Sequence, residues 1–206
     1  MFPSAEVRWF WHSACPQPVH DWFFKTGLSA GGGHPRTDRY LSQPNATEIS
    51  IKERGGIAGL QVKGLVATRR HPVLTSVASH IELWCKWSCT IPGLKLIDAV
   101  SVTKTRWLRQ FDTSKPAATE IPLDLHEKPK AGYSLPIEGC NVELTELRIS
   151  NRSDLWWTLG FEAFGDFDTV PMSLTRVLLP EKATLASIVS SGTFLNYPSW
   201  LLQLAN

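Results

Sequence analysis

The chain has 206 residues, of which 43% are hydrophobic and nine are tryptophan, so a packed core is expected and disorder is not. A formal net charge of only +2 argues against nucleic acid or an anionic membrane as the partner. No apolar run approaches the roughly 20 residues of a membrane-spanning helix, and the N-terminus carries no secretion signal. We therefore expect a cytoplasmic protein that forms a single domain over residues 1–206, although two small domains would also fit this length.

The first elements are a strand and a short helix. An alternating, aromatic-rich run predicts a strand over residues 6–11. The spacing of Val19, Trp22 and Phe23 predicts a short helix. The glycine-rich segment 29–37 is predicted to be a flexible loop, and it lacks the Gly-Lys-Ser/Thr ending of a phosphate-binding loop.

A short strand is predicted over residues 38–42 and a hairpin over residues 48–64. Two alternating runs make up this hairpin, and a pair of glycines between them favours a turn. Lys52 and Arg54 share one face of the first run, and Lys63 lies on the second. Two readings remain open at this point: these cations either point into bulk water or face a site that requires positive charge.

Apolar residues spaced three and four apart predict a helix over residues 71–86. Cys85 and Cys89 lie four apart at the end of this segment. Their spacing and the lack of a matching second ligand pair do not favour a zinc site.

Alternation over residues 100–107 predicts a strand with Lys104 and Arg106 on one face. A solvated face is the alternative reading, because the run of cations continues to Arg109. The proline- and lysine-containing stretch 115–136 is predicted to be an exposed loop with one weak strand.

A second hairpin is predicted from the segments 141–149 and 155–165, which a polar turn separates. The remaining chain is predicted to be helical at residues 172–179, 182–189 and 197–206. Successive hairpins make the sheet mainly antiparallel, and the helices gather at the C-terminal end. The predicted class is therefore α+β.

The order of several short motifs resembles that of the CYTH-like superfamily, the triphosphate tunnel metalloenzymes related to class IV adenylate cyclase and thiamine triphosphatase. The resemblance spans nearly the whole chain, and the collinearity of the motifs carries it. In chain order the motifs are a Glu-containing first strand, "DRYLS", "EISIKERGG", "LQVKG", "VTKTR", "VELTEL", "LGFEAFG" and "NYPSWLL".

The resemblance implies an antiparallel barrel of eight strands with a tunnel through it, flanking helices and a helical C-terminus. It implies that tunnel-facing cations hold a triphosphate and that glutamates hold Mg²⁺ or Mn²⁺. The anion-binding candidates are Arg8, Lys52, Arg54, Lys63, Lys104 and Arg106. The metal candidates are Glu6, Glu143 and Glu162, with Glu48 as a further carboxylate on the predicted faces.

The chain departs from the family's pattern where carboxylates are expected. The opening Glu, Glu, Lys pattern reads Glu6, Arg8 and Phe10 here, and one of two usual basic positions in the third motif is Ser50. Two further acidic positions are Thr145 and Gly160. Each missing carboxylate weakens a site for a hard divalent cation.

These departures favour a binding protein over an enzyme. The expected function is binding of a small phosphate-rich anion, a triphosphate or polyphosphate, with hydrolysis weakened or lost. The alternative is an active Mg²⁺- or Mn²⁺-dependent hydrolase of inorganic, nucleoside or thiamine triphosphate. A third reading is an interaction domain whose barrel is filled by aromatic side chains such as Phe10. No catalytic residue and no oligomeric state is predicted.

Overall fold

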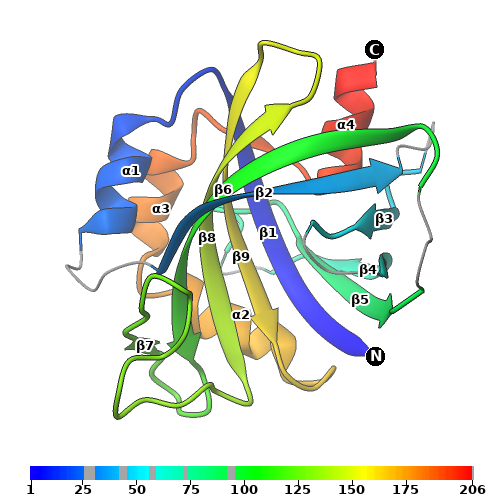
Figure 1. Ribbon diagram of the computed structural model, residues 1–206. Helices are drawn as coiled ribbons and strands as arrows, with labels where there is room; N and C mark the ends of the chain where they lie inside the picture. Colours follow the sequence, from blue (N-terminus) through cyan, green and yellow to red (C-terminus); the bar gives the residue numbers. More distant parts are fainter. Residues whose placement is uncertain (26–30, 42–45, 56–58, 72–73, 92–95, 206) are drawn as a thin grey trace.

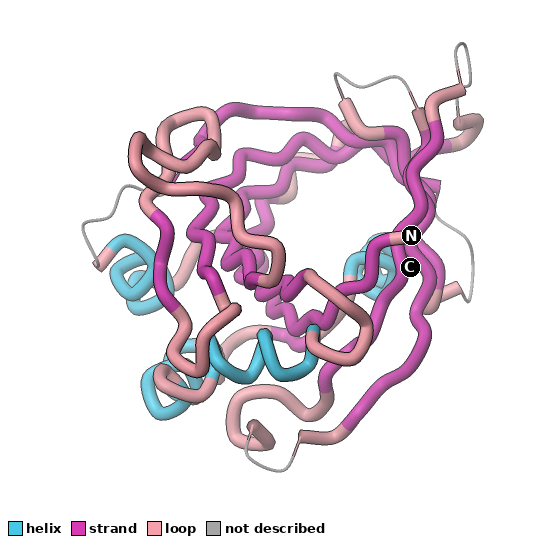
Figure 2. The backbone as a smooth tube through the Cα atoms, turned by 90° about the horizontal axis from the view of Figure 1, so that it is seen from below, coloured by secondary structure: helices cyan, strands magenta, loops and turns pink. Residues whose placement is uncertain are grey.

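The computed structural model describes residues 1–25, 31–41, 46–55, 59–71, 74–91 and 96–205. Eight antiparallel strands form a closed barrel in the spatial order β1, β5, β4, β3, β2, β6, β8, β9, and β9 pairs with β1 to complete the ring. Figure 2 looks into this ring, and Figure 1 shows it from the side. The predicted α+β class and the eight-stranded antiparallel barrel are confirmed.

The bounds of the strands follow from the hydrogen-bonded pairs. The barrel strands are β1 (Phe2–His12), β2 (Gly31–Leu41), β3 (Ile49–Glu53), β4 (Leu60–Arg69), β5 (Ile81–Cys89), β6 (Ala99–Asp112), β8 (Gly139–Ile149) and β9 (Leu155–Phe164). The short β7 (Thr119–Ile121) pairs with β6, and β10 (Thr193–Phe194) pairs with β1. Both predicted hairpins are present as β3–β4 and β8–β9. The second glycine of the predicted first turn lies outside the described residues.

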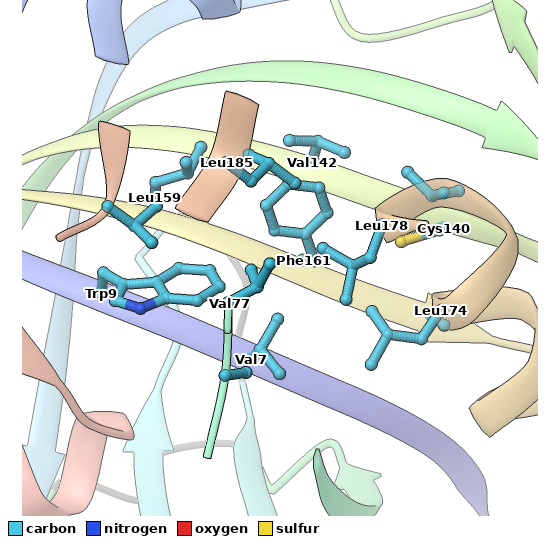
Figure 3. Close-up of a cluster of buried hydrophobic side chains, with 14 of the residues drawn as sticks. Val7, Trp9, Val77, Cys140, Val142, Leu159, Phe161, Leu174, Leu178 and Leu185 are labelled. Carbon is cyan, nitrogen blue, oxygen red and sulfur yellow. The ribbon is translucent and has the colours of Figure 1, made fainter. Parts of the chain in front are cut away.

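The main apolar core lies outside the barrel, between its wall and three helices. These helices are α1 (Gln17–Phe24), α2 (Val170–Leu178) and α3 (Lys182–Ile188). Figure 3 shows Val7 and Phe161 on the barrel strands packed with Leu174 and Leu178 of α2 and Leu185 of α3. Since successive side chains of a strand point to opposite faces, these strands turn their other residues into the barrel.

A second apolar cluster closes one end of the barrel. The C-terminal helix α4 (Tyr197–Ala205) brings Trp200 against the inward-facing Phe10, with the two rings stacked at a centroid distance of 5.3 Å. Tyr197 stacks on Tyr40 in the same way at 5.9 Å. Phe10 therefore fills this end of the barrel, and the rest of the interior is lined mainly by polar side chains.

The predicted helix over residues 71–86 is wrong. Residues 74–77 form turns, and Ile81–Cys89 is strand β5. Trp84 is apolar but points into the barrel, whereas Ile81 and Leu83 pack into the outer core. Apolar side chains on both faces hide the alternation of a strand, and here they produced a spacing of three and four. Cys85 and Cys89 thus lie on a strand.

The predicted flexible loop at 29–37 is also wrong for the described part, because β2 begins at Gly31. A side chain at Gly31 would collide with the backbone of Asp124 and Glu127. Gly32 and Gly33 have φ values of 114° and 87°, which favour glycine, and the pairing with β6 shifts register after Gly32. The glycine run therefore forms an irregular strand.

The other predicted elements agree with the structure. The strand at 100–107 is part of β6, the weak strand in the loop is β7, and the helices at both ends of the chain are present. Among the described residues, none of the helices has the length and hydropathy that crossing a bilayer requires.

Candidate functional site

The inward-facing side chains surround a cavity of about 320 Å³. All six cations proposed from the sequence line it, and so do Glu6, Glu143 and Glu162. Glu48 is exposed and does not line the cavity. Eight basic and four acidic side chains line it in total: Arg8, Arg36, Lys52, Arg54, Lys63, Lys86, Lys104 and Arg106, with Glu6, Glu82, Glu143 and Glu162. Positive charge is in excess.

One part of the cavity wall is an alternating set of cations and carboxylates, which we call the paired group: Arg8, Lys63, Arg106, Glu6, Glu143 and Glu162. Lys63 Nζ donates hydrogen bonds to Glu6 Oε1 and, over 3.3 Å, to Glu162 Oε1. Glu6 and Glu162 face each other in the β1–β9 register. The ammonium group of β4 thus lies between carboxylates of two other strands.

Arg8 makes the second contact of the paired group by reaching across a strand. It lies on β1, and its Nη2 donates to Glu143 Oε2 on β8 over 3.1 Å. Strand β9 lies between them, and there Gly160 is the register partner of both residues. A Cβ atom at Gly160 would collide with the guanidinium carbon and both terminal nitrogens of Arg8. The glycine therefore makes room for the arginine.

Glu143 is enclosed by two guanidinium groups. Its other oxygen, Oε1, accepts a hydrogen bond of 2.6 Å from Arg106 Nη1. Arg106 also pairs with Glu127, which lies in the loop after β7. Burial opposes the charge of Glu143, but Arg106 and Arg8 outweigh it and hold its pKa well below the usual range. Glu143 is therefore ionised at any physiological pH.

The pKa values of Lys63 and its two carboxylate partners shift in different directions. Burial opposes the charge of Lys63, but Glu162 and Glu6 outweigh it and raise its pKa well above the ordinary value. Burial raises the pKa of Glu6, whereas at Glu162 the attraction of Lys63 overcomes burial and lowers the pKa. Opposite charges are thus largely balanced within the paired group.

A second part of the wall, which we call the basic group, consists of Arg36, Lys52, Arg54 and Lys104. Three of these cations share the fully buried Asp38. Its carboxylate accepts hydrogen bonds from Arg36 Nε at 2.8 Å and Lys52 Nζ at 3.3 Å, and Lys104 Nζ lies 3.9 Å away. Among the described residues, no other carboxylate forms an ion pair with a member of the basic group.

Lys104 is held by aromatic rings. It is 6% exposed, and its Nζ donates to the Tyr40 hydroxyl at 2.6 Å. The same Nζ lies 3.7 Å from the centroid of the Tyr197 ring, a cation–π contact. Lys104 thus sits on the aromatic cluster that closes the barrel.

Burial opposes the charged forms of the cations in the basic group. Burial and the neighbouring Lys52 lower the pKa of Lys104 well below its ordinary value. Burial also lowers the pKa of Lys52, although Asp38 acts in the opposite direction. Burial lowers the pKa of Arg54 as well, and the positive charges of Arg36 and Arg106 lower it further. A negative ligand here would stabilise the charged forms of all three side chains.

Two guanidinium nitrogens of cavity-lining arginines have no hydrogen-bond acceptor within the described part of the chain. The two are Arg8 Nη1 and Arg54 Nε, and both are buried. Buried polar groups normally have partners, and leaving one unsatisfied is costly. Both nitrogens belong to cavity-lining residues, so an anion in the cavity could accept from them.

The residues do not fit the metal that the resemblance implies. Glu6 and Glu162 share Lys63, while Glu143 lies between Arg8 and Arg106. No three His, Cys, Asp or Glu side chains in the described ranges are grouped as metal ligands would be. A divalent cation at these carboxylates would meet the cations that are already paired with them.

Sequence reasoning missed several residues of the site. Arg36 falls in the segment predicted to be a loop, and Glu82, Trp84 and Lys86 fall in the predicted helix. The alternation of Glu82, Trp84 and Lys86 would have placed all three on one face of a strand. Asp38 could not have been found by alternation alone, because its role depends on cations from three other positions.

No family model matches this chain, and no curated protein matches it. Among solved structures, the chain is similar to a conserved hypothetical protein from Pyrococcus furiosus, with 12% identity and a TM-score of 0.35. The similarity covers 87% of this chain and 90% of that chain. A likeness at this level carries no conclusion about family or function.

Proposed function

We propose that the barrel binds a phosphate-rich anion, such as a triphosphate or a polyphosphate, in its interior cavity, and that hydrolytic activity is weakened or lost. The observation that carries this function is the excess of eight basic over four acidic side chains that line one cavity. The excess remains when Asp38 and Glu127, which pair with lining cations, are added to the acidic side chains. Guanidinium groups suit phosphate oxygens because they donate two parallel hydrogen bonds.

The basic group is where the anion is expected to bind. Lys52, Arg54 and Lys104 all have lowered pKa values there, first because of burial. The unpartnered Arg54 Nε is an available donor. Lys86, which also lines the cavity, adds charge from β5. A ligand with several negative charges would offset the cost of burying these cations and would satisfy the donor at the same time.

The closed antiparallel barrel is the architecture that the CYTH-like resemblance implies, which supports a triphosphate or polyphosphate as the ligand. The same resemblance implies metal-dependent hydrolysis. The ion pairs of Glu6, Glu143 and Glu162 support the loss of that activity, since these carboxylates are committed to cations.

Titration calorimetry with sodium tripolyphosphate tests this function. We expect the unmodified protein to bind, more tightly at low ionic strength because salt screens the charges. Arg54→Ala should weaken binding by about 1.5–3 kcal/mol, the scale of a hydrogen bond to a charged group. The matched control is Arg148→Ala, which removes an exposed arginine of β8 that pairs with Glu146.

Absence of binding by the unmodified protein, or equal losses in the two variants, would contradict a site in the basic group. Released phosphate is measured in the same mixtures with Mn²⁺ added. We expect none above the background, whereas turnover near the ~10 per second of an ordinary enzyme would favour the hydrolase.

A further inference from the structure

Lys63 bridges two carboxylates of the paired group. Its ammonium group contacts one oxygen of Glu6 and one of Glu162, which face each other across the β1–β9 pair. Ser4 Oγ donates a further hydrogen bond of 2.6 Å to Glu6 Oε1. The three charged side chains are between 12% and 23% exposed, so the ammonium group neutralises the carboxylates largely away from water.

Glu143, another of the four carboxylates that line the cavity, is no more available to a metal. Both oxygens of Glu143 accept hydrogen bonds, one from Arg8 and one from Arg106. Mg²⁺ requires near-octahedral oxygen ligands and gives up its water reluctantly. A divalent cation at any of these oxygens would also be repelled by the ammonium and guanidinium groups already there.

We infer that the Lys63 ammonium group occupies the position between Glu6 and Glu162 that a divalent cation would require. Given the phosphate binding proposed above, the cavity then takes the free phosphate anion rather than its metal complex. A free triphosphate carries more negative charge than its Mg²⁺ complex. It is therefore the better match for a wall with excess positive charge.

The first test measures Mn²⁺ binding by electron paramagnetic resonance, without phosphate. We expect little uptake by the unmodified protein. Lys63→Ala frees the pair of Glu6 and Glu162 and should bind Mn²⁺ at least roughly tenfold more tightly. Lys63→Met, which keeps most of the side-chain volume, serves if the alanine variant does not fold. Lys86→Ala is the matched control, because Lys86 lines the same cavity opposite Lys63 in the β4–β5 register.

Lys86→Ala removes the same charge but leaves the bridge of Lys63 in place, so it should not gain Mn²⁺. Mn²⁺ binding by the unmodified protein as tight as by Lys63→Ala would overturn the position assigned to Lys63. That comparison requires no phosphate ligand, so it is decided independently of the proposed function.

The second test titrates the unmodified protein with tripolyphosphate, once with EDTA and once with excess Mg²⁺. We expect affinity in EDTA to equal or exceed that in Mg²⁺. Binding that requires Mg²⁺ would overturn the inference but keep the phosphate site. Failure to bind in both buffers would remove the proposed function, and the Mn²⁺ measurement would still decide the position of Lys63.

Discussion

At position 160 the chain has no side chain, and the guanidinium group of Arg8 fills the space where one would lie. From the sequence, Arg8 and Gly160 were two separate losses of an expected carboxylate. In the barrel they are register partners, and the arginine crosses the glycine to reach Glu143. The two departures thus belong to one arrangement, in which a carboxylate–arginine pair takes the place of additional carboxylates.

Gly160→Ala should therefore destabilise the protein. Replacing a strand glycine normally stabilises a sheet, but here the new Cβ would force Arg8 from its pocket at a cost of roughly 1–3 kcal/mol. Urea unfolding measures the loss. Gly64→Ala is the control on β4, because its Cβ would meet the Trp87 ring at 3.6 Å, an ordinary contact distance. Equal stability of the two variants would show that Arg8 does not depend on the empty space.

Asp38→Asn should destabilise the protein at neutral pH by roughly 3 kcal/mol, because it leaves three buried or half-buried cations without their shared carboxylate. Burial opposes the charge of Asp38, but Lys52, Lys104 and Arg36 outweigh it and lower its pKa. A lowered pKa stabilises the fold above the unfolded value of about 3.9, and this stabilisation is lost as pH falls towards the folded value.

The difference in the free energy of unfolding between Asp38→Asn and the unmodified protein should therefore be largest at pH 7 and shrink as the pH falls below about 4. Unfolding in urea across this range measures it, with the half-exposed Asp154 changed to Asn as the control. A difference that is absent at pH 7, or that does not change with pH, would contradict the role given to Asp38.

At the scale of the elements, strands with one apolar and one polar face were predictable from the sequence. The alternation over 100–107 placed Lys104 and Arg106 on one face of a strand, and the hairpin pattern placed Lys52 and Lys63 on its polar faces. The structure turns these faces into the barrel. In these strands the outer face packs in the core or faces solvent while the inner face is charged, so the two-residue period is clear.

The elements that were mispredicted have a physical reason in common: their side chains do not follow a single division between core and solvent. Strand β5 carries Trp84 inward between Glu82 and Lys86, and its nitrogen donates to Glu82. Strand β2 begins with glycines because the loop after β7 packs directly against its backbone. Neither contact is visible before the chain is folded, since each depends on a partner distant in sequence.

At the scale of the whole molecule, the barrel has its main core on the outside. Helices α1, α2 and α3 cover one side of the wall, as Figure 1 shows, and bury the apolar face of β1, β8 and β9. The interior therefore does not have to supply the apolar packing that stabilises the fold. Apart from the aromatic cluster at the α4 end, it is free to hold charged side chains around a cavity.

The central claim is that this cavity is an anion site, and a crystal grown with tripolyphosphate tests it most directly. We predict electron density for phosphate groups inside the barrel, within hydrogen-bonding distance of Lys52 and Arg54. The Lys63 bridge between Glu6 and Glu162 should be retained, with no metal at those oxygens. An empty cavity at saturating ligand, or phosphate bound only on the outer surface, would contradict the claim.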